Sequence, residues 1–360
     1  MCRSHLVFVG ALLGSALPAT LCLAQPDAES LAVPVEIAVP AAPAPPHPAP
    51  GEPVTVQVKL ALNKVSEIDT VAETYHVDAY LSARWHDEAA AELLWRPNGP
   101  ERTIFLGDGA IELLGRTIWW PDLELINTVG GRDRTATRLE VFEDGKMLYT
   151  ERFQAELSSN MDFRRYPFDE QSFGILVESY TYREEDLVFD SPEASLGHLR
   201  ETPSPDWQLG APHTKVSRHE YGDGWYSRYS LTIDAVRMPG YFVWQVFLPL
   251  FLILGASWTV FWLSEMSDKI GVAFTCMLTL VAFNFYTATL LPQLPYNTFI
   301  EAVVISSYVA TFLLIGYILF GECLLTKGKE AKAARLQRAG RWLFPVGYAV
   351  SLALTTLRFF

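Results

Sequence analysis

The chain is poor in cysteine, with only Cys2, Cys22, Cys276 and Cys323 among 360 residues. The first two fall in an N-terminal segment that we expect to be removed, and the other two lie in apolar stretches. Neither a disulfide framework nor a CxxC metal site is predicted from this spacing.

Positive charge is also scarce, because 28 lysines and arginines face 41 aspartates and glutamates, a formal net charge of -13. Residues 1–238 hold 36 acidic and 20 basic side chains, whereas residues 239–360 hold 5 and 8. An acidic surface repels phosphate backbones, so no nucleic-acid partner is expected, and cations or cationic small molecules are favoured.

Catalytic motifs are absent as well. The sequence has no GxSxG, HExxH or Walker loop, and its seven histidines lack metal-ligand spacing. The acidic run Glu184-Glu185-Asp186 fits an exposed loop better than an acid–base pair. We therefore expect no enzyme, no cofactor and no resident metal.

The N-terminus predicts export. Arg3 precedes an apolar stretch, and Cys22-Leu23-Ala24 before Gln25 is typical of a cleavage site, which gives a signal peptide over residues 1–24. A lipobox ending at Cys22 is the less favoured alternative, because Leu21 is too large for it. Residues 25–53 form a Pro/Ala-rich linker with seven prolines from Pro40 to Pro53.

Residues 54–238 show the two-residue period of half-buried strands. Apolar residues occupy alternate positions from Val54 to Leu62 and from Tyr229 to Ala235. Asp144-Gly145, between two apolar runs, predicts a hairpin turn. Many short strands with frequent turns predict an N-terminal all-β antiparallel sandwich of immunoglobulin-like (Ig-like) type.

Beyond Arg237, uncharged runs predict membrane-spanning helices, since residues 239–264 carry no charge and a span needs about 20 apolar residues. An all-α four-helix transmembrane domain is expected over residues 239–360. Its spans are predicted at about 240–263, 269–291, 300–321 and 341–358. The loop after the third span is basic and is therefore placed in the cytoplasm, with the N-terminal domain and the C-terminus outside. Its basic residues are Lys327, Lys329, Lys332, Arg335, Arg338 and Arg341.

One segment identifies a family. Met161-Asp162-Phe163-Arg164-Arg165-Tyr166-Pro167-Phe168-Asp169-Glu170-Gln171 closely resembles the signature loop of pentameric ligand-gated ion channels, the Cys-loop receptor family. Ser159 and Phe173 stand where animal receptors carry the cysteines of that loop, and this departure resembles the bacterial branch.

Four further motifs resemble the family in its own order along nearly the whole mature chain. They are Trp85-His86-Asp87 (its WxD strand), Trp119-Trp120-Pro121-Asp122 (its WxPD loop), Arg237 with Pro239 (before its first span) and Leu291-Pro292-Gln293-Leu294-Pro295-Tyr296 (after its second span). The resemblance implies a homopentamer in the inner membrane of a bacterial cell, with the sandwich in the periplasm.

The second predicted span carries a stripe at helical steps of four, three, four and three: Gly271, Thr275, Leu278, Ala282 and Phe285. Spacing alone favours an ordinary packing face, but the resemblance places these residues along the channel. They then give a pore with a small, polar inner end and an apolar outer half that can gate by dewetting. Asp268 and Glu265 stand at the cytoplasmic mouth, and a ring of Asp268 side chains predicts cation selectivity. The resemblance implies that Lys269 points away from the pore.

Aromatic residues outside the core phase point to a ligand site. Tyr80 lies opposite the core face of its strand, and Glu178, Tyr180 and Tyr182 are expected on one face after the strand 173–177. The loop at residues 221–226 adds Tyr221, Trp225 and Tyr226. These positions resemble the family's aromatic box between neighbouring subunits. Aromatic faces with a carboxylate suit a small cation, and Glu178, or as second choice Glu124, would supply the carboxylate. The competing interpretation is that these rings only cover edges of the sandwich.

The resemblance also implies which elements meet at the boundary between the domains. They are Asp69 in the loop between the first strands, Pro167, Phe168 and Asp169 of the signature loop, Arg237, and Pro292, Pro295 and Tyr296. Arg237 and Asp169 are expected to form a buried or partly buried ion pair.

These features predict a ligand-gated, cation-selective channel that conducts monovalent cations through a lipid bilayer. Its agonist is expected to be a cationic amine or an aromatic compound, with the proton as a further candidate stimulus. The alternative is a membrane-anchored periplasmic small-molecule sensor without a pore. The stripe and Asp268 favour a pore over that alternative, and the cytoplasmic loop is too short to hold a signalling domain.

Overall fold

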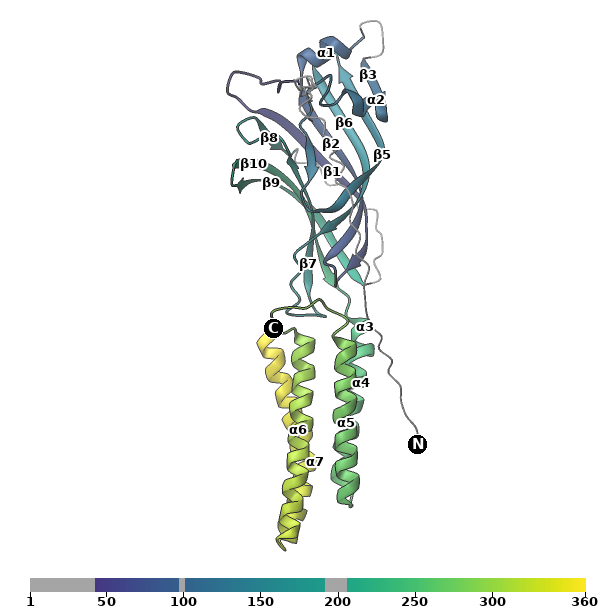
Figure 1. Ribbon diagram of the computed structural model, residues 1–360, viewed down its shortest axis with the longest axis vertical. Coiled ribbons are helices and arrows are strands. Elements are labelled where there is room, and N and C mark those ends of the chain that lie inside the picture. The colour runs from purple at the N-terminus through teal and green to yellow at the C-terminus, as the bar shows by residue number, and fades with distance from the viewer. Residues whose placement is uncertain (1–42, 97–100, 192–205) are drawn as a thin grey trace, which may run out of the picture. The chain divides into compact units, whose positions relative to one another are not determined.

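The computed structural model describes residues 43–96, 101–191 and 206–360 (Figure 1). The predicted signal peptide and the first part of the linker therefore lie outside the described residues. The N-terminal part is built from strands, and the C-terminal part is built from helices.

Two sheets form the N-terminal domain. One has the order β3-β5-β6-β2-β1-β8, and the other has the order β4-β7-β10-β9. All strand pairs are antiparallel except β1 with β8, which run parallel. The predicted all-β sandwich is confirmed, with that one parallel pair added. The strands are β1 (Val54–Asp69), β2 (Thr74–His86), β3 (Arg102–Leu106), β4 (Leu123–Leu125), β5 (Thr128–Phe142), β6 (Lys146–Ser158), β7 (Glu170–Ser179), β8 (Leu187–Asp190), β9 (Trp207–Tyr221) and β10 (Gly224–Arg237).

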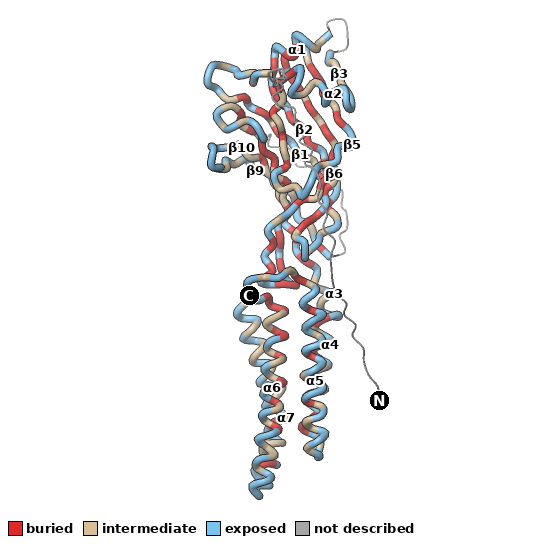
Figure 2. Tube along the Cα trace, in the orientation of Figure 1, coloured by how far each residue is buried: buried red, intermediate tan, exposed pale blue. Residues whose placement is uncertain are grey.

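The apolar side chains of the alternating pattern fill the space between the two sheets. Apolar residues at every second position of β1 and β10 are buried, and they appear as interrupted red stretches along the strands in Figure 2. The predicted hairpin joins β5 to β6, and Gly145 takes a φ of 80° at the turn. A Cβ atom there would lie 2.6 Å from the His86 ring, so both the turn and the packing require glycine.

Two polar residues tie the sandwich together. Asn127 donates from Nδ2 to the backbone oxygens of Ser158 (2.9 Å) and Gly174 (2.8 Å), which belong to different sheets. The Ser159 hydroxyl donates to the Ser172 backbone oxygen at 2.8 Å. This hydrogen bond joins the two ends of the signature loop.

Two short helices, α1 (Glu88–Leu94) and α2 (Asp108–Leu113), were not expected from the sequence pattern. Asp87 of the WxD motif caps α1, because its Oδ1 atom accepts a hydrogen bond from the Ala90 amide at 2.9 Å.

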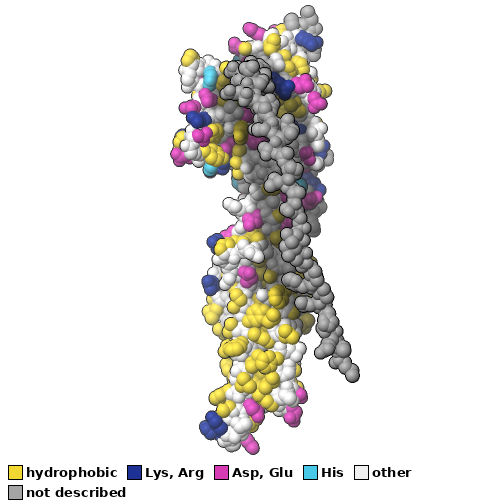
Figure 3. Space-filling model, viewed as in Figure 1, with side chains coloured by type: hydrophobic (Ala, Val, Ile, Leu, Met, Phe, Trp, Pro, Cys, Tyr) yellow, Lys and Arg dark blue, Asp and Glu magenta, His cyan; other side chains and the backbone are white. Residues whose placement is uncertain are grey.

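Among the described residues, four helical segments are long and apolar enough to cross a membrane: Gly240–Trp262, Met266–Thr287, Phe299–Thr326 and Glu330–Phe359. Large apolar side chains cover their outer surface, as Figure 3 shows, and Phe251 and Leu357 are 71% and 78% exposed. Side chains of this kind on a helix surface suit contact with lipid.

The first of these segments is not one regular helix. It consists of α3 (Gly240–Phe242), a π-helical turn η1 (Val243–Phe247), α4 (Leu248–Trp258) and a 3₁₀ turn η2 (Thr259–Trp262). Pro249 lacks an N–H group, and its ring would clash with the carbonyl group four residues earlier. The wider π turn directly before it relieves that clash.

The other helices differ from the predicted spans at their ends. Helix α5 (Met266–Thr287) ends before residue 291, and α6 (Phe299–Thr326) begins with a capping box between Thr298 and Glu301. Helix α7 (Glu330–Phe359) already begins at Glu330, so only residues 327–329 connect α6 to α7. Four of the six basic residues predicted in a loop therefore lie on α7, because the Ala, Lys, Arg and Leu residues there favour a helix.

Candidate functional site

The predicted ligand carboxylate already has partners within the chain. Arg228 stands opposite Glu178 in the β7–β10 pairing and donates from Nε to Glu178 Oε1. The Tyr221 hydroxyl donates to Glu178 Oε2 at 3.1 Å, and Arg228 Nη2 donates to the same hydroxyl at 3.2 Å. The Glu178 side chain is only 2% exposed. Arg228 and Tyr221 therefore occupy both carboxylate oxygens of Glu178.

Three aromatic rings of the predicted ligand site remain on the surface of the described structure. Tyr180, Trp225 and Tyr221 are 77%, 42% and 39% exposed. The Arg218 guanidinium lies 4.7 Å from the centroid of the Trp225 ring and forms an ion pair with Glu184 at 2.8 Å. The chain thus provides a cation of its own over one face of Trp225.

Tyr221 and Tyr226 are held by hydrogen bonds and by each other. Their ring centroids lie 5.4 Å apart in an edge-to-face contact. Burial, and next the negative charge of Glu178, raises the pKa of Tyr221, so its hydroxyl keeps the proton that it donates. The Tyr226 hydroxyl donates to Asp223 at 2.8 Å, and this bond lowers the pKa of the Asp223 carboxyl.

The expectation that Glu178, Tyr180 and Tyr182 share one face is wrong. β7 extends to Ser179, which keeps Glu178 inside the paired strand, and the chain turns only afterwards. Tyr182 then packs on Trp119 with ring centroids 5.4 Å apart, while Tyr180 points to solvent.

The WxPD loop supports this turn. The Tyr180 amide donates to the Asp122 backbone oxygen at 2.9 Å, and the Thr181 hydroxyl donates to Asp122 Oδ2 at 2.5 Å. Glu124 follows on β4, directly opposite Glu178, and is half-buried.

Tyr80 belongs to the other sheet. It lies on β2 with 41% of its surface exposed, opposite in phase to its buried strand neighbours as predicted. The Arg152 guanidinium lies 5.8 Å from its ring centroid and is paired with Asp78 at 2.7 Å. The predicted ligand residues of one chain therefore fall into two groups, one on each sheet.

The predicted ion pair between Arg237 and Asp169 is confirmed. Arg237 donates from Nε and Nη2 to the two Asp169 oxygens at 2.8 and 3.1 Å, and the side chains are 3% and 1% exposed. The Arg237 guanidinium also stacks on Trp207 and Tyr166, at 4.1 and 4.8 Å from their ring centroids. Gln171 donates to Asp169 Oδ2 at 2.7 Å, so the buried carboxylate is well satisfied.

The signature loop contacts the helices directly. The Phe168 ring lies 5.9 Å from Phe299 of α6 and 6.3 Å from Phe247 of η1, measured between centroids. The Tyr296 hydroxyl accepts a hydrogen bond from the Phe163 amide at 3.2 Å, and the Phe299 amide donates to the Arg164 backbone oxygen at 2.9 Å.

The remaining boundary residues play lesser parts in these contacts. Asp69 accepts hydrogen bonds from the Val71 and Ala72 amides and so holds the loop after β1. Pro292 is half-buried, and Pro295 is exposed.

On α5, two faces of the helix differ in burial. Ala273, Cys276, Leu280 and Thr287 are buried, whereas every residue of the predicted stripe, and Asp268 below it, is exposed in the single chain. Leu278 and Phe285 are 70% and 72% exposed. The stripe is therefore not a packing face within this chain.

Sequence reasoning missed Arg228 and Arg218, and it named Asp122 in the WxPD motif without predicting its contacts with Tyr180 and Thr181. The alternation of β10 places Arg228 out of phase with its buried neighbours, but its pairing with Glu178 depends on the strand register. Among residues 43–96, 101–191 and 206–360, no group of three or more histidine, cysteine or acidic residues could hold a metal ion.

Comparison with known proteins decides the family. Residues 43–234, more than half of the chain, match the neurotransmitter-gated ion-channel ligand binding domain. The chain belongs to this ion-channel family. The channel is 27% identical over 318 residues to a proton-gated ion channel of Gloeobacter violaceus, covering 88% of this chain and 86% of the relative. It is also 26% identical over 286 residues to gamma-aminobutyric acid receptor subunit beta-4 of Gallus gallus, covering 76% of this chain and 57% of that one.

The channel is thus a ligand-gated ion channel of a pentameric family, and not an enzyme. Its ligand-binding domain is extracellular, and four of its helical segments are long enough to span a membrane.

Proposed function

We propose that this channel is a homopentamer that opens a cation-selective pore when a small molecule binds its outer domain. In this proposal residues 54–238 form the ligand domain and residues 239–360 the membrane domain. The sandwich and the C-terminus face the periplasm, and the six basic residues from Lys327 to Arg341 face the cytoplasm, following the positive-inside rule.

The observation that carries the proposal is the exposed stripe of α5. Its side of the helix is exposed and has no partner within residues 43–96, 101–191 and 206–360; the stripe consists of Gly271, Thr275, Leu278, Ala282 and Phe285. Five copies of α5 with this side turned inward would enclose a channel. Its outer half would be lined by Leu278 and Phe285. Five copies of each apolar side chain would form a constriction that keeps water out of the closed pore.

Selectivity is assigned to Asp268. It lies in the first turn of α5, one turn before Gly271, and is exposed. A ring of five carboxylates at this position would attract cations and repel anions.

The agonist site is assigned to the boundary between two subunits. One copy would supply Tyr180, Tyr221 and Trp225, with Glu178, Glu124 and Tyr226 behind them, and its neighbour would supply Tyr80. This division accounts for the exposure of aromatic rings on two different sheets. Exposed aromatic faces suit a small molecule that carries an aromatic ring or a cationic amine.

Voltage-clamp recording from oocytes that express the chain tests the proposal. Small amines, aromatic compounds and pH 4 to 9 are applied as stimuli, and reversal potentials are measured in normal and diluted NaCl. A gated current that reverses near the sodium potential is expected. Silence from surface pentamers, confirmed by labelling, across the whole panel would contradict a gated pore.

The Asp268→Ala variant tests the selectivity assignment in the same recordings. Its reversal potential should lose most of its preference for cations, because the carboxylate ring is gone. Glu330→Gln is the matched control, since it removes an exposed carboxylate in the first turn of α7 instead. An unchanged reversal potential in Asp268→Ala would defeat the assignment.

A further inference from the structure

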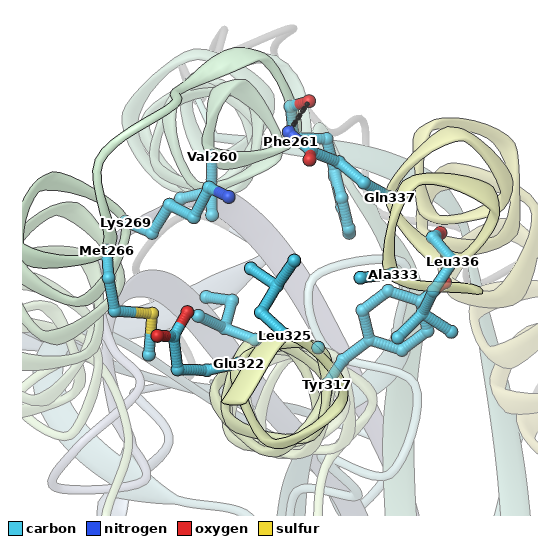
Figure 4. A pocket seen from close by; sticks show the side chains of 12 residues that line it. Val260, Phe261, Met266, Lys269, Tyr317, Glu322, Leu325, Ala333, Leu336 and Gln337 are labelled. Carbon is cyan, nitrogen blue, oxygen red and sulfur yellow. Dashed lines mark hydrogen bonds between the residues drawn. The ribbon is translucent and has the colours of Figure 1, made fainter. Parts of the chain in front are cut away.

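A cavity among η2, α5, α6 and α7 is small (Figure 4). Its volume is about 50 Å³, well below the roughly 300–1,000 Å³ of small-molecule sites. The Gln337 side chain donates to the backbone oxygens of Phe261 and Leu263, at 3.1 and 3.2 Å, and so fixes the packing there. This cavity is therefore part of the helix packing, whereas a buried charge cluster in the sandwich bears on the agonist site.

The cluster consists of a glutamate and two arginines in the interior of the sandwich. Glu151 of β6 is fully buried, and its carboxylate lies 2.9 Å from Nε of Arg134 and 3.3 Å from Nη1 of Arg132. The Tyr149 hydroxyl donates to the same carboxylate at 2.5 Å. Glu151 thus anchors both arginines, which belong to β5, to the neighbouring strand β6.

Arg132 reaches from this cluster to the other sheet. Its side chain is 4% exposed, and Nη2 donates to the Leu123 backbone oxygen of β4 at 2.8 Å. Gly130 and Gly131 precede it at a register shift between β5 and β6, and Gly130 takes a φ of 94°. A bulge of this kind re-aims the side chains next to it, which accounts for the inward direction of the arginine.

The Arg132 guanidinium uses few of its donors. Its Nε and Nη1 atoms are buried without a hydrogen-bond partner, so within the described residues Leu123 accepts its one hydrogen bond. Arginine has five N–H donors, and burial without partners costs stability. A departure of this kind from full pairing is expected at functional sites. The bond to β4 therefore calls for a role beyond stability.

The short strand β4 is the element through which this bond can act on the proposed agonist site. It is three residues long, lies at the edge of its sheet and pairs with β7. Asp122, directly before it, accepts the Tyr180 amide at 2.9 Å and the Thr181 hydroxyl at 2.5 Å. The turn that carries Tyr180 is therefore held by the same edge segment that Arg132 holds.

The opposite end of the cluster lies next to Tyr80. Glu151 faces the interior, and the next residue, Arg152, stands opposite Tyr80 in the β2–β6 pairing and lies 5.8 Å from its ring centroid. Neighbouring residues of a strand face opposite sides of the sheet. The pair of Arg132 and Glu151 thus connects β4 to the strand that borders Tyr80.

We propose that Arg132 is a positioning residue of the agonist site. This assignment rests on the proposed function, since the site itself does. Arg132 holds β4, and with it the Tyr180 turn, at a fixed place relative to the sheet that carries Tyr80. Without the bond to Leu123, β4 keeps its pairing with β7 but loses its support from the other sheet. Loss of Arg132 therefore weakens agonist action through Tyr180 and leaves permeation unchanged.

Amide hydrogen exchange tests whether Arg132 holds β4. The purified full-length channel is measured without agonist, so the result does not depend on gating. In Arg132→Met, residues 119–127 and 179–182 should exchange about tenfold to a hundredfold faster, which corresponds to the loss of one charged hydrogen bond. Unchanged exchange in these residues would overturn the proposal.

Glu151→Gln is a milder second variant, because it keeps the shape of the side chain and removes the charge that anchors Arg132. It should also speed exchange in residues 119–127. Glu140→Gln is the matched control, since Glu140 is likewise buried between two arginines, Arg102 and Arg138, in a cluster that lies within one sheet. It should leave that exchange unchanged, and equal acceleration in both variants would count against the proposal.

Agonist recordings test whether the held turn matters for the ligand. Arg132→Met should raise the concentration for half-maximal current about tenfold and leave the reversal potential unchanged. Arg134→Met removes the other cation beside Glu151, which has no bond to β4, and should change that concentration less than about twofold. In a Tyr180→Ala background, Arg132→Met should add less than about threefold, because the turn no longer carries the ring.

Two results of the recordings would overturn the proposal. A full tenfold effect of Arg132→Met on top of Tyr180→Ala would mean that the arginine acts through general stability. An unchanged half-maximal concentration despite faster exchange would mean that β4 does not place the ring. An unaltered channel that never opens would instead refute the proposed function, and the exchange measurement would still decide whether Arg132 holds β4.

Discussion

Arg237 is held by a bidentate ion pair, by two aromatic rings and by its position at the end of β10, directly before the first membrane segment. Asp169, its partner, belongs to the signature loop, whose Phe168 packs on α6. A single buried pair thus joins the strand that leads into the helices to a loop that rests on them.

Arg237→Ala should therefore impair assembly or gating and leave permeation unchanged in any channel that still opens. Removal of one partner of a buried ion pair costs about 3–5 kcal/mol, because the other charge stays buried alone. Surface labelling and the unfolding temperature of the purified protein measure the loss. Lys146→Ala removes an exposed ion pair with Asp144 and should cost about 0–1 kcal/mol. Normal surface expression and normal currents in Arg237→Ala would refute the assignment.

Tyr180 is the most exposed ring of the proposed agonist site. Tyr180→Ala should raise the agonist concentration for half-maximal current about tenfold, since a cation–π or stacking contact contributes about 1–2 kcal/mol. Val216→Ala, an exposed apolar truncation on β9 of the same sheet, is the control and should leave the response unchanged. The site assignment fails when both variants respond alike.

Residue-level prediction succeeded where a motif fixed both partners, and it failed where the partner depended on register. The pair of Arg237 and Asp169 followed from two family motifs. Arg228 carries no motif, and only the β7–β10 register brings it opposite Glu178. The sequence did not indicate that the Glu178 carboxylate forms an ion pair within the chain.

At the scale of elements, apolar runs predict that the helices exist, but they do not predict where the helices end or where they become irregular. The π turn before Pro249 and the start of α7 at Glu330 depend on local backbone geometry and helix propensity, which hydropathy does not report. The strands were easier to predict, since their two-residue period follows directly from one buried face.

Two glycines of α7 allow a matched test of helix packing. A Cβ atom at Gly340 would lie 2.1 Å from Cε1 of Phe261, whose ring is buried against Tyr317 and Phe344. Gly340→Ala should therefore destabilise the protein by about 1–3 kcal/mol. Gly347 has nothing within 4 Å, and Gly347→Ala should gain up to about 1 kcal/mol in helix propensity.

Thermal unfolding of the two purified variants measures the difference. A lower unfolding temperature for Gly340→Ala, with an equal or higher one for Gly347→Ala, is expected. Equal behaviour of the two would mean that α7 does not approach η2 as closely as the structure places it.

At the scale of the whole molecule, the sequence predicts an acidic β part followed by an apolar helical part, and the described elements from Arg102 to Arg237 include all but the first two strands, while those from Gly240 onward are helical. The burial of the sandwich core could be read from alternation, and the membrane-spanning length of the helices from composition. The residues that contact a neighbouring subunit could not be predicted in this way, because a sequence does not say which exposed side chains another copy of the chain will cover.

The separation of Tyr80, on β2, from Tyr180, in the turn after β7 of the other sheet, has a consequence for mixtures of chains. In the proposed site, one subunit supplies Tyr180 and the adjacent subunit supplies Tyr80. The Tyr80→Ala and Tyr180→Ala variants therefore damage opposite sides of the boundary between two subunits. Co-expression would place an intact Tyr180 face next to an intact Tyr80 face at some boundaries of a mixed ring. The two defects would then complement each other, and recordings would recover an agonist sensitivity that neither parent has. No recovery at any mixing ratio would place both tyrosines in one chain's own site.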